Sequence, residues 1–167
     1  MPAVTLFAGQ KLTAALLLSL VPSGVVKPSD QSLVSSVTFQ NDNDLVVPLA
    51  QLQSFFFACF LDYEGGTAGA ADMKWQWVTP AGTTLRYIAI YENLTPTFAG
   101  AATLGSADIG QAQSNGATNR RGVLMIGAVT TSSTAGNMQL QWAQNTSNAT
   151  ATIVHANSML LNLPLPT

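Results

Sequence analysis

Residues 55 to 91 read FFFACFLDYEGGTAGAADMKWQWVTPAGTTLRYIAIY, and this stretch decides the fold. Met73, Trp75 and Trp77 alternate with smaller or polar neighbours, and residues 85 to 91 divide in the same way into two unlike sets. A period of two is that of a β-strand with two different faces. The stretch therefore predicts three consecutive antiparallel strands. Two of the three tryptophans and all three tyrosines lie in it, so we expect the rest of the chain to pack around this meander.

The remainder of the chain from residue 30 onward also favours short strands. Candidate strands separated by turn-forming residues lie at 32–40, 45–49, 122–131, 137–144, 152–156 and 159–163. Asn41 to Asp44 predicts a turn, because Asn and Asp side chains bond back to their own backbone. Residues 93 to 120 have no clear period, which indicates a functional loop or a hidden short strand. With about eight strands and no alternation with helices, residues 30–167 predict an all-β sandwich or jelly roll.

The N-terminal part has a different character, and residues 1–29 are expected to form an anchoring arm. Residues 12 to 21, LTAALLLSLV, predict a short helix that ends at Pro22. About ten residues are too few to cross a bilayer, which needs about 20. A signal peptide is the alternative, but the flank carries one positive charge and no Ala-x-Ala site follows. A docking helix is therefore favoured, with its anchoring side chains at Leu12, Leu16, Leu17 and Leu20.

Charge is scarce throughout the sequence. Only 8% of the 167 residues are charged, where an ordinary soluble domain has about 25%. An isolated monomer with so little charge tends to associate, so the composition favours an oligomer or a component of a larger particle. The net charge of −2, with six cationic residues, argues against nucleic acid as a partner, because a phosphate backbone requires a clustered basic surface.

The residues that carry enzyme chemistry are few. His155 is the single histidine and Cys59 the single cysteine, so a histidine-based metal cluster or a disulfide is excluded. No Gly-x-Ser-x-Gly motif accompanies His155, and Cys59 lies in an apolar run, which predicts a buried small side chain. The sequence therefore predicts neither an enzyme nor a resident cofactor.

Three carboxylates flank the glycine-rich loop at residues 65–71. Asp62, Glu64 and Asp72 could gather oxygen atoms around a calcium ion, as could Asp42 and Asp44. Neither group matches the Asp-x-Asp-x-Asp-Gly calcium loop with its distal glutamate. Ordinary turn chemistry is the preferred interpretation, and no metal site is predicted.

Glutamines recur on the strand predicted at residues 137–144. Gln139, Gln141 and Gln144 could meet symmetry-related copies at an oligomer axis, where amides satisfy each other and fix the register. The alternative is a solvated strand face, and both interpretations stay open. With Trp142 of the same strand, these residues form the predicted oligomer interface.

Several motifs in a fixed order resemble a known group of proteins. They are DQSLVSS at residues 30–36, NDNDL at 41–45, FLDYEGG at 60–66, KWQW at 74–77, PAG at 80–82 and LQWAQNTS at 140–147. Together they resemble small structural proteins of tailed phages, particularly those of actinobacteria, and residues 9–20 look like the short leader that precedes this β module. The resemblance implies a homotrimer on the tail or capsid surface of a virion, in contact with other virion proteins.

The resemblance places the protein first at a tail tip or fibre, and second on the shell as a capsid decoration protein or head fibre. A carbohydrate-binding module that holds a host surface glycan is a further alternative. That function would need Trp75, Trp77 and Trp142 as an exposed platform, whereas their alternation predicts a core face. A secreted hydrolase would need a titratable cluster around His155.

Overall fold

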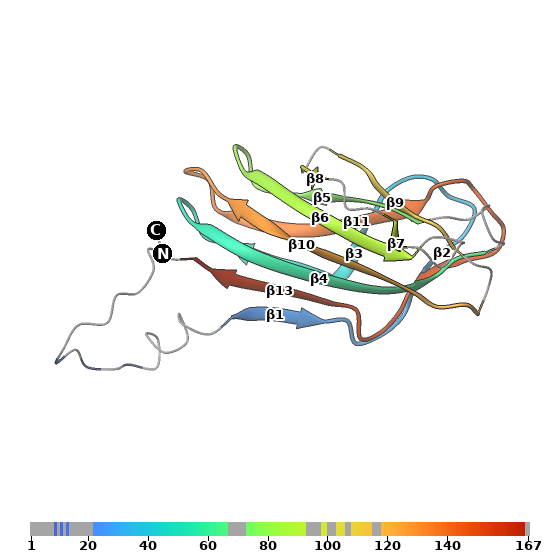
Figure 1. Ribbon diagram of the computed structural model, residues 1–167, viewed down its shortest axis with the longest axis horizontal. Helices are drawn as coiled ribbons and strands as arrows, with labels where there is room; N and C mark the ends of the chain where they lie inside the picture. The colour runs from blue at the N-terminus through green and yellow to red at the C-terminus, as the bar shows by residue number, and fades with distance from the viewer. Residues whose placement is uncertain are drawn as a thin grey trace.

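The computed structural model describes residues 9, 11, 13, 22–66, 73–92, 98–99, 103–105, 108–114 and 118–165. These residues form thirteen β-strands in two antiparallel sheets and contain no helix, which confirms the predicted all-β sandwich (Figure 1). Within the same residues, no helix is long and apolar enough to cross a membrane. The helix predicted at residues 12–21 lies outside the described residues, apart from Thr13.

The two sheets differ in size. The larger sheet has nine strands, which are β1 (Ser23–Val26), β2 (Gln31–Leu33), β4 (Ser54–Glu64), β6 (Thr84–Glu92), β7 (Phe98–Ala99), β8 (Thr103–Leu104), β10 (Arg121–Thr130), β12 (Thr152–Val154) and β13 (Met159–Pro164). The smaller sheet has four strands, which are β3 (Gln40–Leu49), β5 (Met73–Val78), β9 (Gly110–Ala112) and β11 (Gly136–Gln144). The main strand order is β1-β13-β4-β10-β6-β7 in the larger sheet and β3-β11-β5-β9 in the smaller one.

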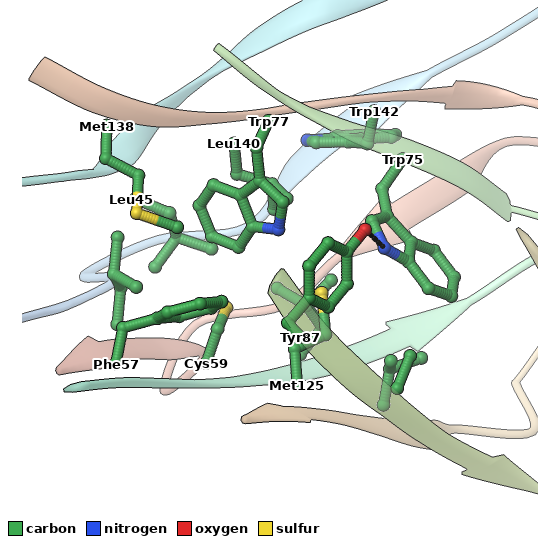
Figure 2. Packing of buried hydrophobic residues seen from close by; sticks show 14 of the residues in the cluster. Leu45, Phe57, Cys59, Trp75, Trp77, Tyr87, Met125, Met138, Leu140 and Trp142 are labelled. Carbon is green, nitrogen blue, oxygen red and sulfur yellow. Dashed lines mark hydrogen bonds between the residues drawn. The ribbon is translucent and has the colours of Figure 1, made fainter. Parts of the chain in front are cut away.

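Aromatic side chains fill the space between the sheets. Trp75 and Trp142 of the smaller sheet and Phe57 of the larger sheet are fully buried. The Phe57 ring meets Trp77 edge to face, with 5.6 Å between ring centroids. Across the sheets, Trp75 Nε1 donates to the Tyr87 hydroxyl at 3.2 Å (Figure 2). The predicted core face of these alternating strands is confirmed, and so is the burial of Cys59.

The three strands of residues 55–91 form as predicted, but they are not neighbours in one meander. β5 lies in the smaller sheet, and β10 inserts between β4 and β6, pairing Met125 with Cys59 on one side and with Ala89 on the other. β10 is apolar along most of its length, which suits it to the middle of a sheet. Its predicted burial on both faces is wrong, because Leu124 and Ile126 are only half-buried.

The turn predicted at residues 41–44 is also wrong, because this segment belongs to β3. The pairing of β3 with β11 shifts register there, from Asn41 opposite Gln141 to Val46 opposite Gln139. Asp42 Oδ1 accepts from the backbone amides of Asp44 and Leu45 at 3.0 and 2.9 Å. The expected side-chain to backbone bonds are therefore present, but they stabilise a bulge inside a strand.

Two further segments differ from the expectation. The strand predicted at residues 32–40 is interrupted after β2, where Ser35 has a φ of 52°. Residues 23–26, which the sequence assigned to the arm, form β1 and pair with β13, Ser23 opposite Asn162 and Val26 opposite Met159. β7, β8 and β9 fall within the long stretch without periodicity, as the alternative of hidden short strands predicted.

Candidate functional site

Most of the charged residues that the structure describes gather where β2 lies, at one end of the sandwich (Figure 1). We call this set the charged end; its members are Lys27, Asp30, Asp42, Asp44, Asp62, Glu64, Arg120 and His155. Backbone bonds tie the group together, since the His155 amide donates to the Asp62 carbonyl at 2.8 Å and the Asn157 amide to the Lys27 carbonyl at 2.9 Å. In a chain with so few charges, this is the first place to look for chemistry.

Lys27 is the most deeply placed cation of the charged end, with a side chain that is 1% exposed. Its Nζ donates to Asp42 Oδ1 at 3.0 Å, Asp44 Oδ2 at 2.9 Å and Gln31 Oε1 at 3.1 Å. An ammonium group has three protons, so these three bonds use all of them. Lys27 therefore fastens the segment before β2 to the bulge of β3, and it has no proton left for a substrate.

Asp42 is equally well satisfied. Its Oδ2 accepts from Trp142 Nε1 at 3.2 Å, in addition to the bonds that Oδ1 accepts from Lys27 and from the backbone. Both oxygens of this carboxylate are engaged by groups of the same fold, so Asp42 is a structural group. Sequence analysis missed this cluster because Lys27 is isolated in the sequence and its partners follow 15 and 17 residues later.

His155 lies between two carboxylates. Its Nδ1 is 3.3 Å from Asp30 Oδ2 and its Nε2 is 3.5 Å from Glu64 Oε2. The backbone amide of Ala156 donates to Asp30 Oδ1 at 2.7 Å and, with a smaller contribution from His155, lowers the pKa of Asp30. Both ring nitrogens therefore face carboxylates, whereas a Ser-His-Asp triad needs one of them to face a hydroxyl. This geometry does not support the hydrolase alternative.

Asp62 and Glu64, two of the candidate calcium ligands, are each paired with a different basic side chain. Arg120 forms a bidentate ion pair with Asp62, which raises the pKa of Arg120 and occupies both oxygens of the carboxylate. Glu64 faces His155 instead, and Asp72 lies outside the described residues. Within the described part of the chain, no group of three side chains is arranged to hold a metal ion.

Glutamines form a row of hydrogen bonds across the outer side of the smaller sheet. Gln76 Nε2 donates to Gln141 Oε1 at 2.6 Å, and Gln141 Nε2 donates to Asn41 Oδ1 at 2.7 Å. Gln139 Nε2 donates to the Asp42 carbonyl at 3.1 Å. We call Asn41, Gln76, Gln139 and Gln141 the amide row. Gln139 and Gln141 are half-buried, so a neighbouring subunit could still reach this row, and their place in an oligomer interface stays a prediction.

The other two residues of the predicted interface do not offer surface to a neighbour. Trp142 and Gln144 are both fully buried within the chain. Gln144 Oε1 accepts from the backbone amides of Ser36 and Asn148 at 3.2 and 3.0 Å, and its Nε2 donates to the Thr150 carbonyl at 2.9 Å. Gln144 thus fixes two loops at the charged end, and Trp142 belongs to the core.

The tryptophans cannot act as an exposed sugar platform. Trp75 and Trp142 are 0% exposed and Trp77 is 3% exposed. Stacking on a sugar ring requires an accessible aromatic face. The geometry of these three side chains therefore does not favour the carbohydrate-binding alternative.

The side of the larger sheet that faces away from the core is apolar across five strands. Strand register places Ile90, Leu124, Phe60, Met159 and Val26 in one row and Ile88, Ile126, Ala58, Leu161 and Gly24 in the next. The nine apolar side chains of these two rows are called the outer face. Val26 is 59% exposed, Met159 45% and Phe60 38%.

The outer face has polar borders at both ends of the strands. On one side the next row is mixed, with Arg86 followed by Ala128, Phe56 and Leu163, and the threonines Thr84 and Thr130 lie beyond it. The Asp62–Arg120 pair lies on the other side. An apolar centre with a polar rim is the anatomy of a protein interface. The signal was present in the sequence as nearly continuous apolarity at residues 55–61 and 122–131, which resembles strands covered on both sides.

The predicted anchoring residues Leu12, Leu16, Leu17 and Leu20 lie outside the described residues. Their role in attachment stays a prediction.

Comparisons with known proteins give no family. No protein-family model matches the sequence, and no curated protein does. Among solved structures, the tripod from the baseplate of bacteriophage Tuc2009 is similar with a TM-score of 0.38 and 7% identity, over 98% of this chain and 75% of that one. Chains of infectious bursal disease virus, strains Gt and Gx, have TM-scores of 0.23 and 0.19 at 10% identity; 99% of this chain is covered, but only 47% of each of theirs. Similarity at this level assigns neither a family nor a function.

Proposed function

We propose that the protein is a non-enzymatic structural component of a tailed bacteriophage virion. In this proposal it is a homotrimer displayed at a tail tip or fibre, and the N-terminal arm attaches it to the particle. The observation that carries the proposal is the outer face, an apolar surface five strands wide with a polar rim, on a chain with only 8% charged residues. The tailed-phage source and the trimer rest on the motifs quoted above.

The chemistry of the charged end supports a structural role. The charged groups of Lys27, Asp42 and Arg120 are each paired with an oppositely charged side chain of the same fold. His155 has a carboxylate at each ring nitrogen. A catalytic centre instead keeps a reactive group accessible in a cleft and within reach of a substrate atom. What this molecule offers its surroundings is contact surface.

Sedimentation and particle labelling test the proposal at two levels. We expect the purified full chain to sediment as a trimer at micromolar concentration, and antibodies against it to label the tails of intact phage particles. Labelling of the shell instead would move the protein to the capsid decoration alternative. A stable monomer, or particles that contain none of the chain by mass spectrometry, would contradict the proposal.

A further inference from the structure

We propose that residues 12–21 of one copy pack onto the outer face of a neighbouring copy. We call these residues the leucine segment. The inference rests on the proposed homotrimer and identifies the surface that holds its subunits together. It reassigns the leucines of residues 12–21 from particle attachment to subunit contact, which leaves residues 1–11 of the arm for attachment. Size, chemistry and chain connection support this occupant, and symmetry favours it over a second outer face.

The dimensions of the outer face suit a short segment. Five strands and two residue rows cover about 20 Å by 15 Å, or about 300 Å². A ten-residue helix, the form predicted for the leucine segment, measures about 15 Å by 10 Å. Its footprint therefore fits within the outer face.

The chemistry of the two surfaces also agrees. Six of the ten residues of the leucine segment are Leu or Val, and the sequence has no charged residue between Lys11 and Lys27. The outer face likewise has only apolar side chains, with its charges confined to the rim. Contact between them removes apolar area from water on both sides without burying an unpaired charge.

The chain connection also suits this occupant. The leucine segment ends at residue 21, directly before Pro22 and β1. β1 is the edge strand of the larger sheet, and its Gly24 and Val26 border the outer face. The chain therefore enters the described fold at the margin of the outer face, and the sequence has no linker between the leucine segment and that point.

Symmetry favours exchange between copies. Face-to-face packing of two outer faces is an isologous contact, which pairs subunits two by two and does not close a trimer. A ring of three needs two different complementary surfaces on each subunit. The leucine segment and the outer face are such a pair, so each copy can give one segment and receive one.

Full-length variants test this arrangement. Leu16→Lys/Leu17→Lys damages the leucine segment, and Leu161→Lys damages the outer face at a side chain that is 38% exposed. Leu52→Lys is the matched control, since it makes the same leucine-to-lysine change at a side chain that is 67% exposed, in the turn between β3 and β4 and away from the outer face. Circular dichroism and thermal melting check that each variant folds. If Leu161→Lys does not fold, Met159→Lys replaces it, at a side chain of the outer face that is 45% exposed.

Analytical ultracentrifugation at micromolar concentration then gives the outcome. We expect trimers for the unaltered chain and for Leu52→Lys, and monomers for each of the other two variants alone. Mixed in equal amounts, those two should form a heterodimer, because one retains an intact outer face and the other an intact leucine segment. No association in the mixture, or a trimer that survives Leu16→Lys/Leu17→Lys, overturns the inference while the proposed function stands. If the unaltered chain is a monomer, both this inference and the proposed homotrimer are contradicted.

Discussion

Lys27 Nζ and Asp42 Oδ1 lie 3.0 Å apart inside the protein, and the two side chains are 1% and 0% exposed. A buried ion pair is costly to form and much more costly to break on one side only. Since Asp42 also anchors Trp142 and the bulge of β3, this pair joins the charged end to the aromatic core.

Replacing Lys27 by methionine should destabilise the fold by about 3–5 kcal/mol, because Asp42 is left buried without its counter-ion. Unfolding in urea, followed by tryptophan fluorescence, measures the change. The matched control is Lys74→Met, which loses a contact with the Phe39 ring at 4.9 Å and should cost about 1 kcal/mol or less. Equal decreases in the free energy of unfolding for the two variants would show that the buried Lys27–Asp42 pair contributes no more to stability than the contact of Lys74 with Phe39.

Alkaline pH should weaken the protein through Tyr87. Burial raises the pKa of this hydroxyl to about 12 from the ordinary value of 10.0. The folded state thus keeps a proton that the unfolded chain releases, so this contribution to stability is complete below pH 10 and is lost as the pH rises towards 12. Tyr87→Phe should reduce the fall in unfolding free energy between pH 10 and 12, as measured by urea titrations. An unchanged slope would contradict this assignment.

Tyr87→Phe should also cost about 1 kcal/mol at neutral pH, because Trp75 Nε1 loses its acceptor inside the core.

Gly127 should tolerate no side chain. A Cβ at this position would lie 2.2 Å from the Arg86 carbonyl oxygen, so the backbones of β10 and β6 would have to separate. We expect Gly127→Ala to destabilise the protein by about 1–3 kcal/mol or more, measured as a shift of the urea midpoint. Gly122→Ala, on the same strand, is the control; its nearest contact is the edge of the Phe60 ring at 3.1 Å, which can move. A larger loss at Gly122 would refute the packing of β10 against β6.

The Cys59 thiol should be inert in the folded protein. It is fully buried, and burial raises the pKa of the thiol well above its ordinary value, so the reactive thiolate is suppressed. Iodoacetamide at pH 8 should leave the native chain unmodified over hours. In about 6 M guanidinium, which unfolds most domains, it should alkylate the chain completely. Rapid labelling of the native protein would show that β4 is open to solvent.

Sequence patterns predicted what depends on neighbours along one strand. The alternation of Trp75 and Trp77 on β5, and of Met138 and Leu140 on β11, predicted which side chains enter the core. These faces follow from the period of two and need no knowledge of the partner strand.

Partner choice could not be predicted in this way. β10 separates β4 from β6, although it follows them by about thirty residues or more along the chain, since strand order is set by tertiary packing. The charged end depends in turn on that packing. Lys27 meets Asp42 only because β3 carries a bulge, and Asn41 to Asp44 by themselves indicate a turn. The role of Gln144 also depends on tertiary packing. The sequence assigned it to an oligomer interface, but its side-chain oxygen accepts hydrogen bonds from the backbone amides of Ser36 and Asn148 within the same chain.

The outward sides of the two sheets differ in kind, since one carries aliphatic groups and the other the amide row. A sandwich with one apolar side and one amide side has a defined polarity across its two sheets. When a neighbouring copy covers the apolar side, the amide side is left for polar surroundings, so every copy in an assembly takes the same orientation without an additional guide.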